Sequence, residues 1–143
     1  MKKIIIAVLA LLSFGVAEAQ FKVIGNDITT YVVYPMRAGV SLKYTKIGEV
    51  SEYYLQLNTT NQFDKSMLIY LGNRDNARAS LKQMLNELFA PDLSTELQDN
   101  NGKPFIIVGS IRMGAKGFAV FREGYAGHAY IRLSQIEDML EIM

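Results

Sequence analysis

The sequence predicts an α+β fold, mainly an antiparallel β sheet or partial barrel of about seven to nine strands, with a mid-chain helix and a short C-terminal helix. Segments with alternating or β-branched apolar residues recur along the chain, and two segments with helical spacing directly follow strands. Most connections are short, which favours antiparallel pairing, because a parallel crossover needs about a dozen residues or more. The length of 143 residues, with no linker or low-complexity tract, predicts one domain.

Residues 1–19 have the three-part layout of a secretory signal peptide. A positive start (KK) precedes an apolar run and the small-x-small pattern AEA at 17–19. The apolar run is shorter than the ~20 residues that span a membrane. We therefore expect cleavage after Ala19, a single domain over 20–143 without a membrane span, and a periplasmic or secreted location in a bacterium.

The first part of the mature chain is expected to form strands. The segments with β-branched residues or two-residue alternation are 21–24, 28–34, 39–46, 52–59 and 66–71. Turn residues separate them: GND at 25–27, Gly48, and the polar stretch 58–64. Because 66–71 is continuously apolar, we expect that strand to be covered on both faces.

The hydrophobic period then changes from two residues to that of a helix. Within 75–89 the apolar residues that share one helical face are Ala77, Leu81, Met84, Leu85 and Leu88. Asn73 or Asp75 can cap the start of this helix, and Pro91 enforces its end.

The second part of the chain is again expected to form strands before a final helix. The strand segments are 95–98, 104–111, 117–122 and 128–133. The residues DNNG at 99–102 have the composition of a turn, and they lack the later Glu of a calcium-binding loop. Gly109 marks a bulge or a close contact. A helix over 134–143 would begin with a capping box formed by Ser134 and Glu137.

Composition excludes several classes of function. Lys and Arg number 15 against 14 Asp and Glu, so the charge balance gives no electrostatic argument for binding nucleic acid. The absence of Cys excludes disulfides, thiolate zinc sites and a cysteine nucleophile. Phosphate-binding glycine motifs are also absent. We therefore expect no cofactor, no metal and no nucleic-acid partner.

A candidate ligand site surrounds the single histidine. His128, Tyr130 and Arg132 alternate along one predicted strand and so share a face. If Arg122 pairs with His128 across the hairpin, it joins them and the group can bind a small anionic ligand. A shift of the register by one residue moves Arg122 to the opposite face, and the alternative is then an ordinary solvated strand face.

Tyr125 is the best single candidate for a contact residue, because it stands in the glycine-rich hairpin segment EGYAG. The alternative is an aromatic turn residue that folds back onto the sheet.

Together these observations predict an exported, non-catalytic module that binds a protein, peptide or small ligand in the cell envelope. One alternative is a small periplasmic hydrolase that uses His128 with a carboxylate such as Glu123, although no serine lies in a G-x-S-x-G motif. Another is an inhibitor or immunity-type protein that blocks a partner enzyme. The absence of a catalytic motif argues against the hydrolase.

Overall fold

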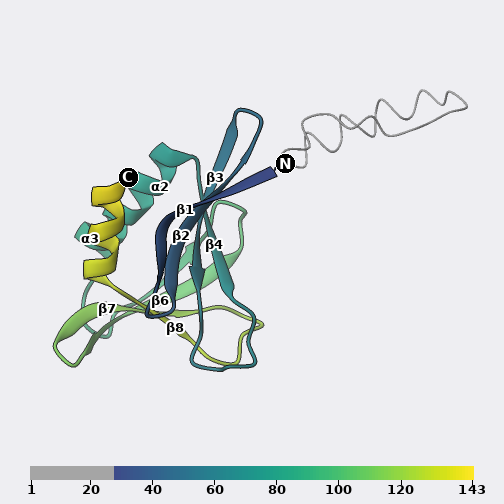
Figure 1. Cartoon of the computed structure of the whole chain (residues 1–143). Coiled ribbons are helices and arrows are strands. Elements are labelled where there is room, and N and C mark those ends of the chain that lie inside the picture. Colours follow the sequence, from purple (N-terminus) through teal and green to yellow (C-terminus); the bar gives the residue numbers. More distant parts are fainter. Residues whose placement is uncertain (1–27) are drawn as a thin grey trace, which may run out of the picture.

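The computed structural model describes residues 28–143 and has an α+β fold with two four-stranded antiparallel sheets (Figure 1). The first sheet has the order β1 (Ile28–Arg37), β2 (Val40–Ile47), β3 (Val50–Leu57) and β4 (Met67–Gly72). The second has the order β5 (Ser94–Gln98), β6 (Pro104–Arg112), β7 (Ala115–Phe121) and β8 (Ala129–Arg132). The predicted signal peptide at 1–19 and the predicted strand at 21–24 lie outside the described residues.

The predicted fold class is confirmed, and the eight strands of the described residues divide into two separate sheets. Each sheet is a simple meander, because every strand pairs with the next one along the chain. Tight turns support this order. The turns Ala38-Gly39 and Met113-Gly114 have positive φ at both residues, as two-residue hairpin turns that match the strand twist require.

The mid-chain helix has two parts. The α-helix α2 (Arg74–Gln83) continues directly into the π-helical segment η1 (Met84–Leu88), which the apolar spacing did not predict. Asn73 caps α2 as expected, since its side-chain oxygen accepts the backbone N–H of Asn76 at 2.8 Å.

The final helix α3 (Leu133–Ile142) begins one residue earlier than predicted. Its first turn does not use the expected capping box of Ser134 and Glu137. Instead, the side-chain carbonyl of Gln135 accepts the backbone N–H of Arg132 at 2.9 Å, and its amide donates to the carbonyl of Arg37. Gln135 therefore both starts the helix and ties it to β1.

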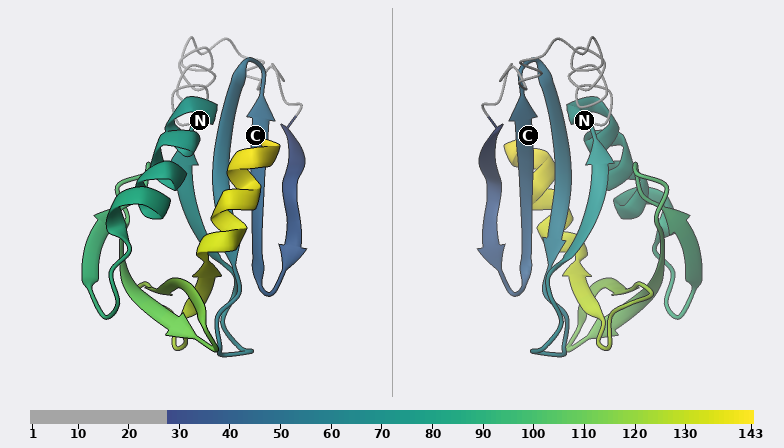
Figure 2. Two further views of the ribbon diagram at one scale, coloured as in Figure 1. Left: turned by 90° about the vertical axis from the view of Figure 1, so that its left-hand side faces the viewer. Right: turned by 90° about the vertical axis from the view of Figure 1, so that its right-hand side faces the viewer.

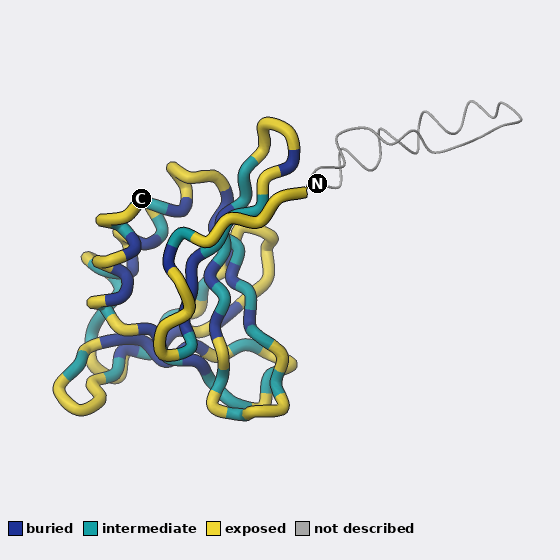
Figure 3. Tube along the Cα trace, in the orientation of Figure 1, coloured by how far each residue is buried: buried dark blue, intermediate teal, exposed yellow. Residues whose placement is uncertain are grey.

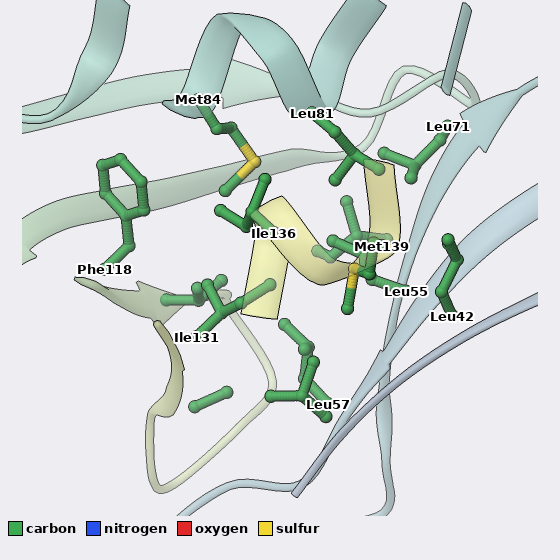
Figure 4. Packing of buried hydrophobic residues seen from close by; sticks show 14 of the residues in the cluster. Leu42, Leu55, Leu57, Leu71, Leu81, Met84, Phe118, Ile131, Ile136 and Met139 are labelled. Atoms are coloured by element: carbon green, nitrogen blue, oxygen red, sulfur yellow. The ribbon is translucent and has the colours of Figure 1, made fainter. Parts of the chain in front are cut away.

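One hydrophobic core joins both sheets and both helices. The helices α2 and α3 lie on the same side of the molecule (Figure 1), and Figure 2 shows α3 in front of strands of the first sheet. Buried segments of strands and helices face one another, while the turns are exposed (Figure 3). Figure 4 shows Met84 of α2–η1 and Ile136 of α3 between Phe118 of the second sheet and Leu55 of the first.

Two loops connect the sheets to each other at the end of the molecule away from the C-terminus (Figure 1). The carboxylate of Asp64, in the β3–β4 loop, accepts the backbone N–H groups of Ala126 and Gly127, in the β7–β8 loop, at 3.1 and 2.9 Å. Beside them, the N–H of Thr60 donates to the carbonyl of His128 at 2.9 Å. The first sheet thus positions the loop that leads into β8.

Within the described residues, no helix has the length and apolar character needed to cross a membrane.

Candidate functional site

The register of the β7–β8 hairpin decides which predicted site residues meet. Phe118 pairs with Ile131 and Val120 pairs with Ala129, so the continuation of the ladder places His128 beside Phe121. The rings of His128 and Phe121 lie with centroids 5.2 Å apart. The pairing of Arg122 with His128 that the predicted group needed is not formed, because the register differs by one residue.

Arg122 instead lies on the opposite face and connects the two sheets. Its guanidinium forms an ion pair with Asp99 at 2.9 Å and donates to the carbonyl of Leu68 in β4. Only 9% of the Arg122 side chain is exposed, and the Asp99 side chain is fully buried. Asp99 also accepts the N–H groups of Asn101 and Lys103, which folds residues 99–102 as the predicted turn.

Tyr125 adopts the second of the two arrangements considered for it. Its half-buried ring packs against the hydrophobic core, and its hydroxyl donates to the carbonyl of Ser66 at 3.2 Å. The hairpin aromatic therefore folds back onto the protein.

His128, Tyr130 and Arg132 do share the outer face of the second sheet, away from the core. Tyr130 lies across Gly117, where an added Cβ would come within 2.8 Å of its hydroxyl oxygen. That hydroxyl is within hydrogen-bond distance of the carbonyl oxygens of Ser110 (3.2 Å) and Ala115 (3.1 Å). Glycine in β7 thus makes the room that holds the tyrosine ring flat against the sheet.

Arg112, which was not among the predicted site residues, completes the group. Its guanidinium carbon lies 4.1 Å from the centroid of the Tyr130 ring, and its Nη2 is 2.6 Å from Nε2 of His128. An arginine can only donate, so Nε2 of His128 is the acceptor in this contact. The two-residue turn Met113-Gly114 is the sequence feature that could have predicted this position of Arg112. The turn pairs Arg112 with Ala115 and so places Arg112 on the outer face.

We call this set the outer-face group. It consists of Arg112, Phe121, His128, Tyr130 and Arg132. Within residues 28–143 the only ion pair is Arg122–Asp99, so the two arginines of the group have no carboxylate within 4.0 Å. Phe121 is 41% exposed and Ile106, its neighbour in β6, is 37% exposed. The group therefore combines uncompensated positive charge with accessible apolar surface.

The side chain of His128 has an arginine and an aromatic ring as its neighbours. In the described part of the chain its ring contacts Arg112 and Phe121, and no hydrogen bond joins it to a serine or to a carboxylate such as Glu123. A general base needs such a partner to orient it. No three His, Asp or Glu side chains among residues 28–143 gather closely enough to hold a metal ion.

Comparisons with protein-family models, with curated proteins and with solved structures found no match to this chain.

Proposed function

We propose that this chain is a non-catalytic binding module that recognises the carboxylate of a protein, peptide or small molecule through its outer-face group. The observation that carries the proposal is the contact between Arg112 and His128 on an open sheet face where neither Arg112 nor Arg132 forms an ion pair among the described residues. Arginine presents five N–H donors, and the contact with His128 uses only one nitrogen. The remaining donors suit a carboxylate, which accepts two parallel hydrogen bonds from a guanidinium.

The apolar members of the group favour a ligand in which an aromatic or aliphatic part adjoins the acid. Phe121 lies beside His128 on the neighbouring strand, and the Tyr130 ring lies beside it two residues further along the same chain segment. Aromatic and arginine side chains together are the residue types enriched where proteins bind their partners. Export to the periplasm or medium is part of the proposal, supported by the layout of residues 1–19.

The proposal is tested with N-acetylphenylalanine, which carries a carboxylate beside an aromatic ring, and with the corresponding uncharged amide. In ¹⁵N-resolved NMR titrations, the acid is expected to shift amide signals of residues 119–121 and 128–132, while the amide shifts them little. Replacing Arg112 with Gln is expected to weaken binding of the acid about tenfold, because it removes a charge-assisted hydrogen bond.

Arg74→Gln is the matched control, because Arg74 is an exposed arginine of α2, outside the outer-face group. It should leave the titration unchanged. Equal shifts with the acid and the amide, or equal affinity in Arg112→Gln and the parent protein, would rule out recognition of a carboxylate by this group.

A further inference from the structure

A cavity of about 330 Å³ lies between the α2–η1 helix and the core faces of both sheets. Its floor includes Leu55 and Leu57 of β3 and Ile131 of β8, and its mouth includes Ser80, Gln83 and Gln98. Ligand pockets in proteins commonly measure about 300–1,000 Å³, and an apolar cavity of about 150 Å³ is enough for benzene. The space therefore suits a small organic molecule.

The cavity is on the other side of the second sheet from the outer-face group. Phe105, Val120 and Ile131 line it from β6, β7 and β8, and their side chains belong to the buried core. The residues of the outer-face group do not line it. A ligand in the cavity would thus be independent of a ligand on the outer face.

The deep part of the cavity is lined by apolar side chains, and its mouth is lined by polar side chains without charge. Ser80 and Gln83 are presented by α2, and Gln98 by the end of β5. No hydrogen bond within the described residues uses these three side chains, so their donors and acceptors are available. Asp99 is the single charged side chain of the lining, and Arg122 neutralises it in a buried ion pair. A charged ligand would lose its hydration here without gaining a counter-ion.

The wall formed by the helix has an irregular backbone at the cavity. Met84 and Leu88, the first and last residues of the π-helical segment η1, both line it. Single π-helical turns are rare in proteins overall, but those that occur are often found at functional sites. Met84 is also a flexible, polarisable side chain that adapts to the shape of its neighbours. This wall can therefore adjust to an occupant at less cost than a regular leucine-lined helix.

We propose that this cavity binds a neutral, amphipathic small molecule, with its apolar part against Leu55, Leu57 and Met84 and a hydrogen-bonding end at Ser80, Gln83 or Gln98. The apolar depth, the unused polar side chains at the mouth and the neutralised charge of Asp99 select this chemical class. Binding requires none of the outer-face residues and is a second binding property of the same domain.

The test uses N-phenyl-1-naphthylamine, a neutral dye whose fluorescence increases in apolar surroundings. The purified protein is expected to bind it saturably with a stoichiometry of one. Ser80→Leu places extra apolar volume in the cavity mouth, so the affinity for the dye is expected to fall about tenfold. Because Ser80 is half-buried on an amphipathic helix, this variant should keep its far-UV circular dichroism spectrum.

Two variants separate the cavity from other surfaces. Ser80→Ala keeps the space open, and Lys82→Leu adds the same leucine on an exposed position of α2 that does not line the cavity. Both should bind the dye as the parent protein does. The proposal is overturned if the parent protein does not bind the dye, or if folded Ser80→Leu binds it with the affinity of Lys82→Leu. Arg112→Gln should not alter dye binding, which keeps this test independent of the outer-face proposal.

Discussion

Arg122 illustrates how one residue of register determines the role of a side chain. Had it paired with His128, it would project from the open face of the second sheet. One position away, it instead points between the sheets, where it bonds to Asp99 and to the carbonyls of Leu68 and Pro104. The side chain that was a candidate for ligand binding is therefore part of the connection between the two sheets.

Removing this arginine should cost considerable stability. Arg122→Met leaves the carboxylate of Asp99 buried without its counter-ion, so the free energy of unfolding is expected to fall by about 3 kcal/mol. Urea denaturation at neutral pH measures the change. Arg132→Met replaces an exposed arginine that forms no ion pair among the described residues, and its effect should stay within about 0.5 kcal/mol.

A double variant tests whether the unpaired charge is the cause. Adding Asp99→Asn to Arg122→Met removes that charge, and we expect the double variant to be more stable than Arg122→Met alone. A further loss of stability in the double variant would show that packing of the guanidinium, and not its charge, matters most.

At the scale of the elements, the passage from η1 to β5 depends on a close backbone contact. The N–H of Gly109 in β6 donates to the carbonyl of Leu93, and its own carbonyl accepts the N–H of Asp92. Pro91 forms a parallel bridge with the same glycine. The chain leaving the helix is thereby fastened across β6 before the second sheet begins, which is the close contact that Gly109 was expected to mark.

A methyl group at this position has no room. A Cβ added to Gly109 would lie 2.0 Å from the carbonyl oxygen of Ala90, which is backbone and cannot rotate away. We expect Gly109→Ala to lower the free energy of unfolding by about 2–3 kcal/mol. Ser110→Ala, at the next residue of β6, is the control and should change it little. Similar values for both variants in urea denaturation would contradict the close contact.

Periodicity located most of the elements from the sequence, because alternation and helical spacing are properties of single segments. The π-helical segment Met84–Leu88 was not predicted, since its apolar residues fit an α-helix equally well. The face shared by His128, Tyr130 and Arg132 followed from alternation within one strand. The position of Arg112 beside His128 did not follow from alternation, because it depends on pairing across two hairpins, which alternation within one strand cannot assign.

At the scale of the whole molecule, residues 28–143 form two halves with the same order of strands followed by a helix. A four-stranded meander followed by a helix occurs twice, as β1–β4 with α2 and as β5–β8 with α3. The halves share one core and are also joined by their loops, where an added Cβ at Gly127 would lie 2.6 Å from the backbone nitrogen of Asn61. Because the β7–β8 loop leads directly to His128, the contact between the halves also positions the outer-face group.

The carboxylate of Asp64 makes this contact between the halves sensitive to acid. Hydrogen bonds to its carboxylate lower the pKa of Asp64 below its usual value. The largest effect comes from the Thr59 hydroxyl, and smaller effects come from the N–H groups of Gly127 and Ala126. A group whose pKa is lower in the folded state stabilises the fold above its unfolded pKa, and this contribution disappears as the pH falls through the folded pKa. For an aspartate the contribution is complete above about pH 5 and is lost below about pH 4.

We therefore expect Asp64→Asn to be less stable than the parent protein at pH 7 and to approach its stability as the pH falls below about 4. Urea denaturation of both proteins across this range gives the difference, and amide hydrogen exchange at Gly127 reports the loop contact itself. Asp138→Asn is the control, because that exposed carboxylate of α3 forms no hydrogen bond between the halves among the described residues. A stability difference for Asp64→Asn that is the same at pH 3 and pH 7 would show that the ionised carboxylate is not what holds the two loops together. At pH 7, where N-acetylphenylalanine carries its carboxylate, faster exchange at Gly127 in Asp64→Asn should be accompanied by weaker binding of that ligand, because the loop that positions His128 loosens.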